Sequence, residues 1–153
     1  MIREIEPEEL DSLLSLYAQL HPNDEAAPRE RIEAVWQAVL SDPRQHIIVA
    51  ESEGKIVASC VVVIVPNLTH SAHPYAVVEN VVTDAGSRRQ GWATRCLDYA
   101  KQLAVREGCY KMMLLTGSKE EDTLRFYERA GYNRTDKTAF VQWLIPRPGK
   151  DRA

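Results

Sequence analysis

The segment Val81–Thr94 constrains the fold of this 153-residue chain more than any other stretch. Its apolar first part predicts a buried strand that ends at Asp84. A short basic loop follows, and an amphipathic helix begins at Gly91. In this order the free N–H groups of the loop and of the first helical turn point to one spot, with the positive end of the helix dipole behind them. Such a spot suits phosphate oxygens, although short glycine loops before helices are often purely structural.

Length and composition predict one ordinary globular domain. With 153 residues, 44% apolar and 27% charged, the chain is large enough for a core of two or three layers. The net charge of −3 argues against a general nucleic-acid binder. No apolar run approaches the roughly 20 residues that span a bilayer, and the start of the chain does not resemble a signal peptide. We therefore expect neither nucleic acid nor membrane as a partner.

The cysteines favour a reducing compartment. Cys60, Cys96 and Cys109 are an odd number, and none belongs to a Cys-x-x-Cys pair. The first two fall in apolar segments, which is typical of buried free thiols. We expect a cytoplasmic protein.

Hydrophobic periodicity predicts an alternation of strands and helices. The expected strands cover residues 2–5, 46–52, 55–65, 75–83, 112–116, 132–134 and 138–145. The expected helices begin at Pro7, Pro28, Gly91 and Glu120, and Glu53-Gly54 is a two-residue hairpin signal. This order predicts an α/β (α+β) fold with a mixed, mostly antiparallel central sheet flanked by helices on both faces. Residues 1–145 are expected to form a single domain, and residues 146–153 a flexible C-terminal tail.

Two motifs in this order resemble the GCN5-related N-acetyltransferases, the GNAT family. The family's acyl-CoA loop has Arg or Gln, two residues, Gly, one residue, then Gly or Ala, and Arg88–Ala93 fits every fixed position. The second motif is an aromatic pair in a helix followed by Gly and another aromatic residue, as in Phe126–Tyr132. The close resemblance covers about Tyr75 to Leu144; before that only the order of elements agrees.

The resemblance implies that acetyl-CoA is the co-substrate, with no metal. Its pyrophosphate would lie on the loop N–H groups, and its pantetheine arm would hydrogen-bond along the preceding strand, where a backbone N–H near Val81 could stabilise an oxyanion. The expected cofactor-binding residues are Val81, Val82, Thr83, Arg88, Arg89, Gln90, Gly91, Trp92, Ala93 and Thr94. One departure is Glu120, at a position where many family members carry Asn.

Tyr127 is the candidate general acid. A phenol, with a pKa of about 10, is protonated at neutral pH and can donate to a departing thiolate. The alternative is an aromatic side chain that only packs near the end of its helix.

Glu79 is the candidate general base, because some amino-sugar acetyltransferases of the family carry an acidic residue there. A primary amine is mostly protonated at pH 7 and must lose a proton before or during attack. Glu79 could instead bind the substrate ammonium or be a solvated carboxylate.

Residues for the acceptor are harder to assign. His21, Asn23 and Asp24 lie between the first two helices, and His70 and His73 lie in the loop before Tyr75; in the family these loops border the acceptor pocket. Each histidine could equally be an ordinary surface residue. His70-x-x-His73 as half of a metal site lacks completing ligands.

The leading hypothesis is an enzyme that moves an acetyl group from acetyl-CoA to a primary amine of a small molecule by direct attack. A protein or peptide amine stays open, and so does a homodimer. A non-catalytic acyl-CoA-binding sensor or regulatory module is the alternative from another class, and Tyr127 and Glu79 count against it. Nucleotide-binding folds of Rossmann or Walker type fail, because their glycine spacings are absent.

Overall fold

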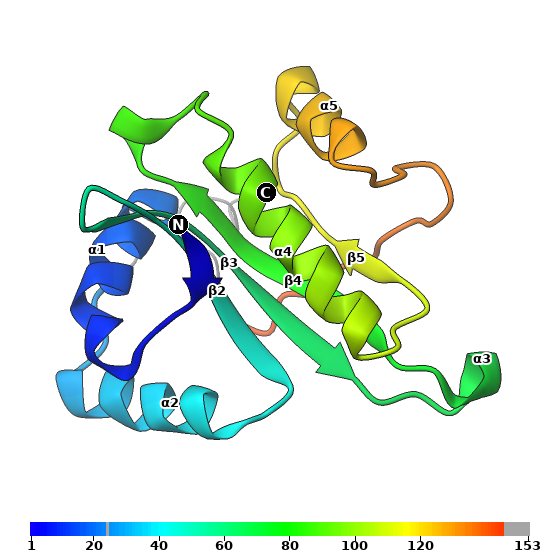
Figure 1. The fold of residues 1–153 in the computed structure, drawn as a ribbon, viewed down its shortest axis with the longest axis horizontal. Helices are drawn as coiled ribbons and strands as arrows, with labels where there is room; N and C mark the ends of the chain where they lie inside the picture. The colour runs from blue at the N-terminus through cyan, green and yellow to red at the C-terminus, as the bar shows by residue number, and fades with distance from the viewer. Residues whose placement is uncertain (24, 146–153) are drawn as a thin grey trace. The chain divides into compact units, whose positions relative to one another are not determined.

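The computed structural model describes residues 1–23 and 25–145 (Figure 1). Asp24 and the predicted tail at 146–153 lie outside these residues. The chain divides into two compact units, Met1–Thr116 and a second that begins at Gly117. We describe each unit by itself, and the single domain expected over 1–145 stays a prediction.

The first unit contains five strands and most of the helices. The strands are β1 (Ile2–Glu4), β2 (Gln45–Ser52), β3 (Lys55–Val65), β4 (Tyr75–Thr83) and β5 (Met112–Leu114). The helices are α1 (Leu10–Leu20), α2 (Arg29–Ser41), the single turn α3 (Thr69–Ala72) and α4 (Trp92–Arg106), with 3₁₀ turns η1 (Pro7–Glu9) and η2 (Ala85–Ser87). The periodicity predicted each of these strands and longer helices, whereas α3 replaces part of an expected polar loop.

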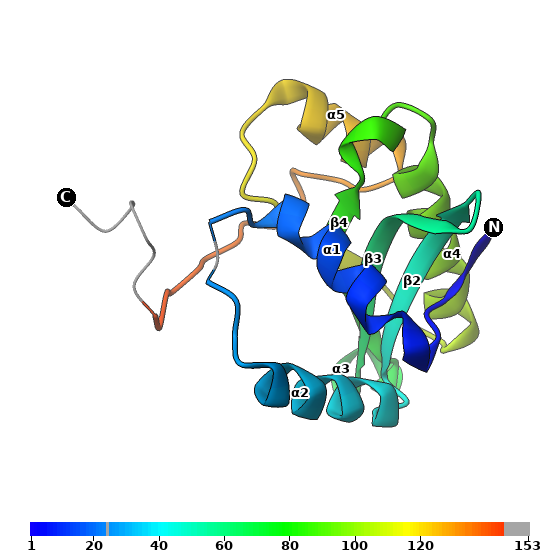
Figure 2. The same ribbon diagram turned by 90° about the vertical axis from the view of Figure 1, so that its left-hand side faces the viewer.

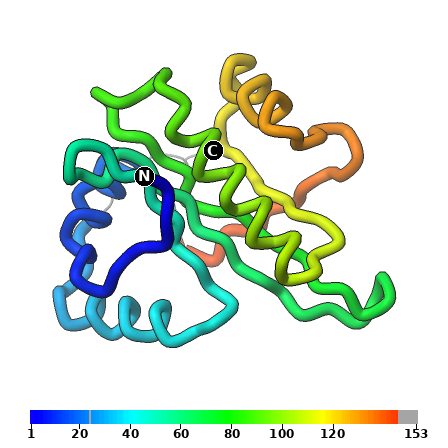
Figure 3. Tube along the Cα trace, in the orientation of Figure 1, coloured from blue at the N-terminus to red at the C-terminus, as the bar shows by residue number. Residues whose placement is uncertain are grey.

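The strands form one mixed sheet in the order β1-β2-β3-β4-β5. The first four are antiparallel to their neighbours, and β5 is parallel to β4. The β2–β3 hairpin turns at Glu53 and Gly54, both at positive φ, as a type I′ turn requires. Figure 3 traces the chain from β4 through a loop into α4, which returns along the sheet. The predicted mixed, mostly antiparallel sheet is therefore confirmed.

Helices cover both faces of this sheet (Figure 2). On one face Leu13 of α1 and Trp36 of α2 form a core cluster with Val49 of β2 and Val61 of β3. On the other face α4 presents Cys96, Leu97, Ala100, Leu103 and Ala104, all of which are buried. Cys60 and Cys96 are buried free thiols, and Cys109 is partly buried. No helix within the described residues is long and apolar enough to cross a bilayer.

The second unit contains one helix, α5 (Glu121–Arg129), and the two strands predicted after it are wrong within the described residues. In the first predicted strand, Asn133 Oδ1 accepts hydrogen bonds from the N–H groups of Thr135 and Asp136 at 2.7 and 3.2 Å. This local turn competes with a strand. The second predicted strand has the right residue types, but Phe140 is 92% exposed. Strand propensity depends on burial and cross-strand packing, and Phe140 is not buried in its unit.

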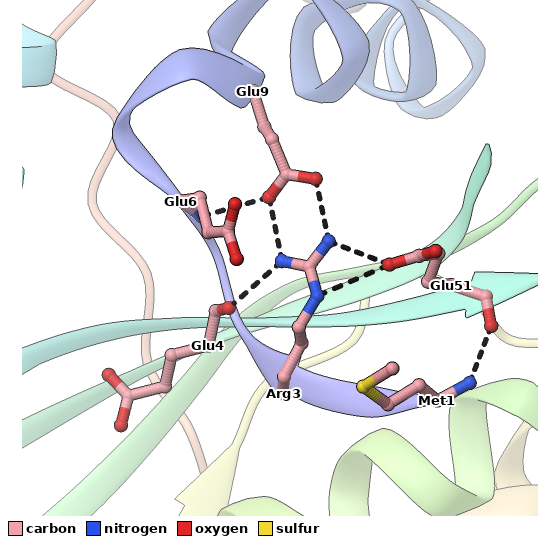
Figure 4. Close-up of polar contacts among 6 residues, drawn as sticks. All are labelled: Met1, Arg3, Glu4, Glu6, Glu9 and Glu51. Atoms are coloured by element: carbon pink, nitrogen blue, oxygen red, sulfur yellow. Dashed lines mark hydrogen bonds and ion pairs between the residues drawn. The ribbon is translucent and has the colours of Figure 1, made fainter. Parts of the chain in front are cut away.

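An ion-pair cluster fixes the N-terminal strand and the start of α1 to the sheet (Figure 4). The Arg3 guanidinium donates to both carboxylate oxygens of Glu9, at 2.8 and 2.7 Å, and to Glu51 Oε2 at 2.8 Å. Arg3 and Glu9 are only about one-fifth exposed. The hydrogen bonds from Arg3 lower the pKa of Glu9. Arg3 thus holds together β1, β2 and the turn that leads into α1.

Replacing Arg3 should destabilise the fold, because Arg3→Met leaves two half-buried carboxylates facing each other. We expect a loss of about 1–3 kcal/mol in the free energy of unfolding, measured by urea denaturation at pH 7. The control is Arg44→Met, which removes an exposed ion pair to Asp42 and should cost much less. Equal losses in the two variants would contradict this role of Arg3.

The same cluster makes stability depend on pH. The lowered pKa of Glu9 means that its contribution is complete above the unfolded pKa near 4.5 and is lost as the pH falls through the folded value. The wild-type protein should therefore lose more stability than Arg3→Met when urea denaturation is repeated below pH 4.5.

Candidate active site

A one-residue bulge interrupts β4 at the centre of the predicted site. On β3, Ser59 and Val61 are two residues apart, but their partners on β4, Val82 and Glu79, are three apart. The extra residue lies at Asn80, which has a φ of 51°. Asparagine tolerates this left-handed conformation better than most residues with a side chain. The bulge is thus compatible with the residue that the sequence supplies.

The bulge reverses the direction of the backbone hydrogen bonds along β4. Before it, the N–H of Ala76 donates to Lys111 O beside β5, at 2.9 Å. After it, the N–H of Asp84 donates to Val57 O in β3, at 2.8 Å. Residues of equal parity in a regular strand point the same way, so these opposite directions follow from the inserted residue.

Beyond the bulge, no strand of the described residues pairs with the β5 side of β4. The parallel pairing with β5 ends at Val78, opposite Leu114. Because the bulge has reversed the parity, Val81 and Thr83 direct their N–H and C=O groups away from β3, toward this edge. Val82 points to β3 instead. The outward N–H and C=O groups of Val81 and Thr83 lie where the sequence predicts binding of an extended ligand.

The loop between η2 and α4 forms a concave array of N–H groups. Arg89 and Gly91 have positive φ values of 62° and 77°, and Gly91 is the N-cap of α4. The first intrahelical bond is from Arg95 N–H to Gly91 O, at 3.1 Å. Among the described residues, the N–H groups of residues 89–94 make no hydrogen bond of ordinary geometry. Backbone N–H groups arranged in this way bind anions.

Glycine at position 91 meets a conformational need and leaves open space. Its φ of 77° is strained for most other residues, and a Cβ there would contact nothing within 4 Å. The neighbouring Ala93 is half-buried and Thr94 is exposed. The loop therefore leaves room above its N–H groups.

Basic side chains surround this array. Arg88 and Arg89 are exposed and form no ion pair within the described part of the chain. Arg95 lies 3.7 Å above the Trp92 ring and donates from Nη2 to Gln90 O at 3.3 Å. Trp92 in turn donates from Nε1 to Gln90 Oε1 at 3.2 Å. Trp92 therefore supports a third arginine, which the sequence analysis missed although the i, i+3 spacing could have indicated it.

Two consecutive polar residues at the bulge are exposed to solvent. Glu79 and Asn80 are both exposed, in a strand whose Ala76, Val78 and Val82 are buried. Glu79 forms no ion pair with any described residue. Its carboxylate is therefore accessible to a ligand, as the predicted role requires.

A half-buried tyrosine from α1, with a buried hydroxyl, lies beside the bulge. Burial raises the pKa of Tyr17 to about 12, and the neighbouring Ser59 and Asn80 side chains offset this in part. Its hydroxyl has no hydrogen bond of ordinary geometry within the described residues. Tyr17 thus stays protonated at physiological pH and brings an available hydroxyl next to Asn80.

The predicted acceptor residues do not come together at one place. His21 and Asn23 are exposed and follow directly after α1. The end of α1, just before His21, contacts the chain after β4 through the Gln19–Asp84 hydrogen bond. His70 and His73 precede the other end of β4, so the length of that strand separates the two groups. His70 stacks on Tyr110, and His73 Nδ1 lies 3.0 Å from Gly108 O. No group of three or more His, Cys, Asp or Glu side chains within residues 1–23 and 25–145 could hold a metal ion.

Tyr127 belongs to the second unit. It lies in the last turn of α5, half-buried, with ring contacts to Phe126 and Tyr132 at centroid distances of 5.0 and 6.1 Å. The Tyr132 N–H donates to Tyr127 O at 3.0 Å, and Gly131 between them has a φ of 94°. The aromatic motif therefore forms one local cluster, and the acid role of Tyr127 stays a prediction.

Comparison with known proteins identifies the family. The model of the acetyltransferase (GNAT) family matches residues 10–132. An aminoglycoside N(6')-acetyltransferase type 1 from Serratia marcescens is 26% identical over 136 residues, covering 87% of this chain and 91% of its own. A glucosamine 6-phosphate N-acetyltransferase from Trypanosoma brucei brucei is 27% identical, covering 89% and 90%.

A solved structure agrees with these relatives. A provisionally assigned acetyltransferase from Agrobacterium tumefaciens strain C58 is 37% identical, with a TM-score of 0.87 over 94% of this chain and 99% of that one. The expected fold class is thus confirmed. The chain belongs to the GNAT family of acetyltransferases and is an acyl-CoA-dependent N-acetyltransferase.

Proposed function

We propose that this protein transfers an acetyl group from acetyl-CoA to a primary amine of an amino sugar. The observation that carries the proposal is the open edge of β4 leading directly into a loop of unbonded N–H groups. An extended acyl chain that ends in a pyrophosphate matches these two features in the same order. Acetyl-CoA supplies the activated acetyl group, and residues of this chain bind the cofactor and transfer the protons.

The loop would hold the pyrophosphate through its backbone. The N–H groups of Arg89, Gln90, Gly91, Trp92, Ala93 and Thr94 have no competing acceptor among the described residues. The side chains of Arg88 and Arg89 add positive charge, and Arg95 adds more at the same helix end. Gly91 supplies the required conformation without blocking access.

The strand would hold the pantetheine arm by edge pairing. Val81 and Thr83 offer the outward N–H and C=O groups. Val82, which pairs with Ser59 of β3, fixes the position of this part of the strand. The Val81 N–H follows directly after the bulge and can donate to the acetyl oxygen as negative charge develops there. These groups are fixed by the sheet, so little reorganisation accompanies the reaction.

Two side chains would move protons. Glu79, exposed beside the bulge, would take a proton from the substrate ammonium, directly or through a water, or bind it. Tyr127 would donate a proton to the departing thiolate. The two roles are complementary, because attack releases a proton and thiol departure requires one.

The acceptor class rests on the relatives and on charge. The names of the two relatives described above specify amino-sugar substrates, an aminoglycoside and glucosamine 6-phosphate. The unpaired Glu79 carboxylate suits the cationic amine of such a molecule. His21, Asn23 and Asp24 are the proposed contacts to the rest of the sugar; of these, His21 and Asn23 lie directly after α1.

An amine panel tests the proposal. Purified protein with acetyl-CoA should release free CoA thiol faster with glucosamine 6-phosphate or an aminoglycoside than with a lysine-containing peptide. Acetyl-CoA binding without acceleration by any amine would favour a non-catalytic acyl-CoA sensor. Acceleration by the peptide alone would favour a protein-directed enzyme.

Gly91→Glu should abolish acetyl-CoA binding while the fold is kept. The new side chain adds negative charge above the N–H array and strain at a φ of 77°. Isothermal titration with acetyl-CoA measures the effect. The matched control is Gly54→Glu in the β2–β3 hairpin, with a φ of 75° and equally open surroundings, which should bind normally. Wild-type affinity in Gly91→Glu would mean that the loop does not hold the pyrophosphate.

Tyr127→Phe should lower kcat by about 100-fold or more, with little change in the KM for acetyl-CoA, because only proton donation is lost. Steady-state kinetics at saturating amine measure both constants. Tyr132→Phe, the same change in the ring that contacts Tyr127, is the control and should keep its kcat. Unchanged turnover in Tyr127→Phe would exclude it as the acid.

A further inference from the structure

The side chain of Gln19, near the end of α1, reaches the chain just after β4. Its Nε2 donates to Asp84 Oδ1 at 2.9 Å, and its Oε1 accepts from the Ala85 N–H at 3.0 Å. The two ends of one amide thus bind two successive residues that lie 65 and 66 positions further along the chain. This pairing fixes both the position and the orientation of the segment.

Asp84 connects this amide to the turn that follows. Its Oδ2 accepts from the Gly86 N–H at 3.0 Å and from Ser87 Oγ at 3.3 Å, and its C=O accepts from the Ser87 N–H at 2.9 Å. A Cβ on Gly86 would lie 3.3 Å from Oδ2, so the turn closes tightly on the carboxylate. The hydrogen bond from Gln19 is the largest cause of a lowered pKa of Asp84. The carboxylate therefore stays ionised at neutral pH.

The turn η2 determines where the proposed pyrophosphate loop begins. It is followed directly by Arg88 and then by Arg89, the first residue of the N–H array. On its other side, the Asp84 N–H bonded to β3 is the first backbone bond after the open edge. A shift at Asp84 would therefore move the loop relative to the edge of β4.

We propose that Gln19 is a positioning residue for acetyl-CoA: it holds the Asp84–Ser87 turn from α1 so that the pyrophosphate loop is in register with β4. This inference rests on the proposed function of the loop. It adds a residue far away in sequence, on an element that the two family motifs do not include. If the hydrogen bonds of Gln19 only stabilised α1, their loss would leave the affinity for acetyl-CoA unchanged.

An exchange of the two partners tests the pair directly. In Gln19→Glu, two carboxylates face each other. In Asp84→Asn, the new amide has only one acceptor oxygen for the two donors, Gln19 Nε2 and the Gly86 N–H, so its NH2 group faces one of them. In the double variant, the carboxylate introduced at position 19 still accepts from the Ala85 N–H. The amide introduced at position 84 donates to that carboxylate, while its oxygen accepts from Gly86 and Ser87. The double variant thus restores the pattern with reversed polarity.

The control is Gln37→Leu, a change of an exposed glutamine on α2. We expect each single variant to raise the Kd for acetyl-CoA about tenfold at pH 7, the equivalent of one net hydrogen bond, with kcat at saturating acetyl-CoA little changed. Hydrogen exchange at the amides of Ala85, Gly86 and Ser87 should accelerate in the unliganded single variants. Both effects should largely disappear in the double variant. Isothermal titration, steady-state kinetics and exchange mass spectrometry measure them.

Wild-type affinity in the single variants, or a double variant no better than either, would overturn the positioning role. A change in thermal stability alone, with the Kd unchanged, would overturn it as well. If the wild-type protein and Gln37→Leu both fail to bind acetyl-CoA, the proposed function falls first and this inference with it. The wild-type titration therefore separates the two failures.

Discussion

The inserted residue in β4 is the constraint on which the rest of the site depends. A regular strand would direct its hydrogen bonds in one alternating pattern from Tyr75 to Thr83. The left-handed turn at Asn80 shifts that pattern, so β4 pairs with β5 in its first half and presents a bare edge in its second half. Glu79, the residue just before the bulge, is exposed. One residue in a left-handed conformation thus produces the ligand edge directly beside an accessible carboxylate.

Helix α1 supports this region from one side of the sheet. Its apolar face packs into the core with Leu13, while Tyr17 lies beside the bulge and Gln19 binds the turn that follows the strand. The start of the same helix is held to the sheet by the Arg3 cluster. The helix is therefore fixed at both ends. It is a rigid support for the left-handed bulge at Asn80 and for the Asp84–Ser87 turn.

Much of this arrangement could be predicted from local patterns. The hairpin at Gly54, the strand before Asp84 and the helix after Gly91 follow from turn chemistry and periodicity, which act over a few residues. The bulge left only a weak signal, two polar residues in succession in an apolar strand. The contact between Gln19 and Asp84 left none, because its partners are distant in sequence. The final strands were predicted from propensity alone, and the exposure of Phe140 shows that the burial such a strand needs is missing in its unit.

The buried cysteines have a practical consequence for studying the reaction. Burial raises the pKa of both Cys60 and Cys96, that of Cys96 to about 12, and it also raises the pKa of Cys109. Since the thiolate is the reactive form and Cys60 and Cys96 are also buried, these two side chains are poor nucleophiles near neutral pH. With a chromogenic disulfide reagent that detects liberated coenzyme A, the background from the native protein should therefore come mainly from the partly exposed Cys109. The molecule can be assayed continuously without removing its own thiols, two of which fill the core between sheet and helix.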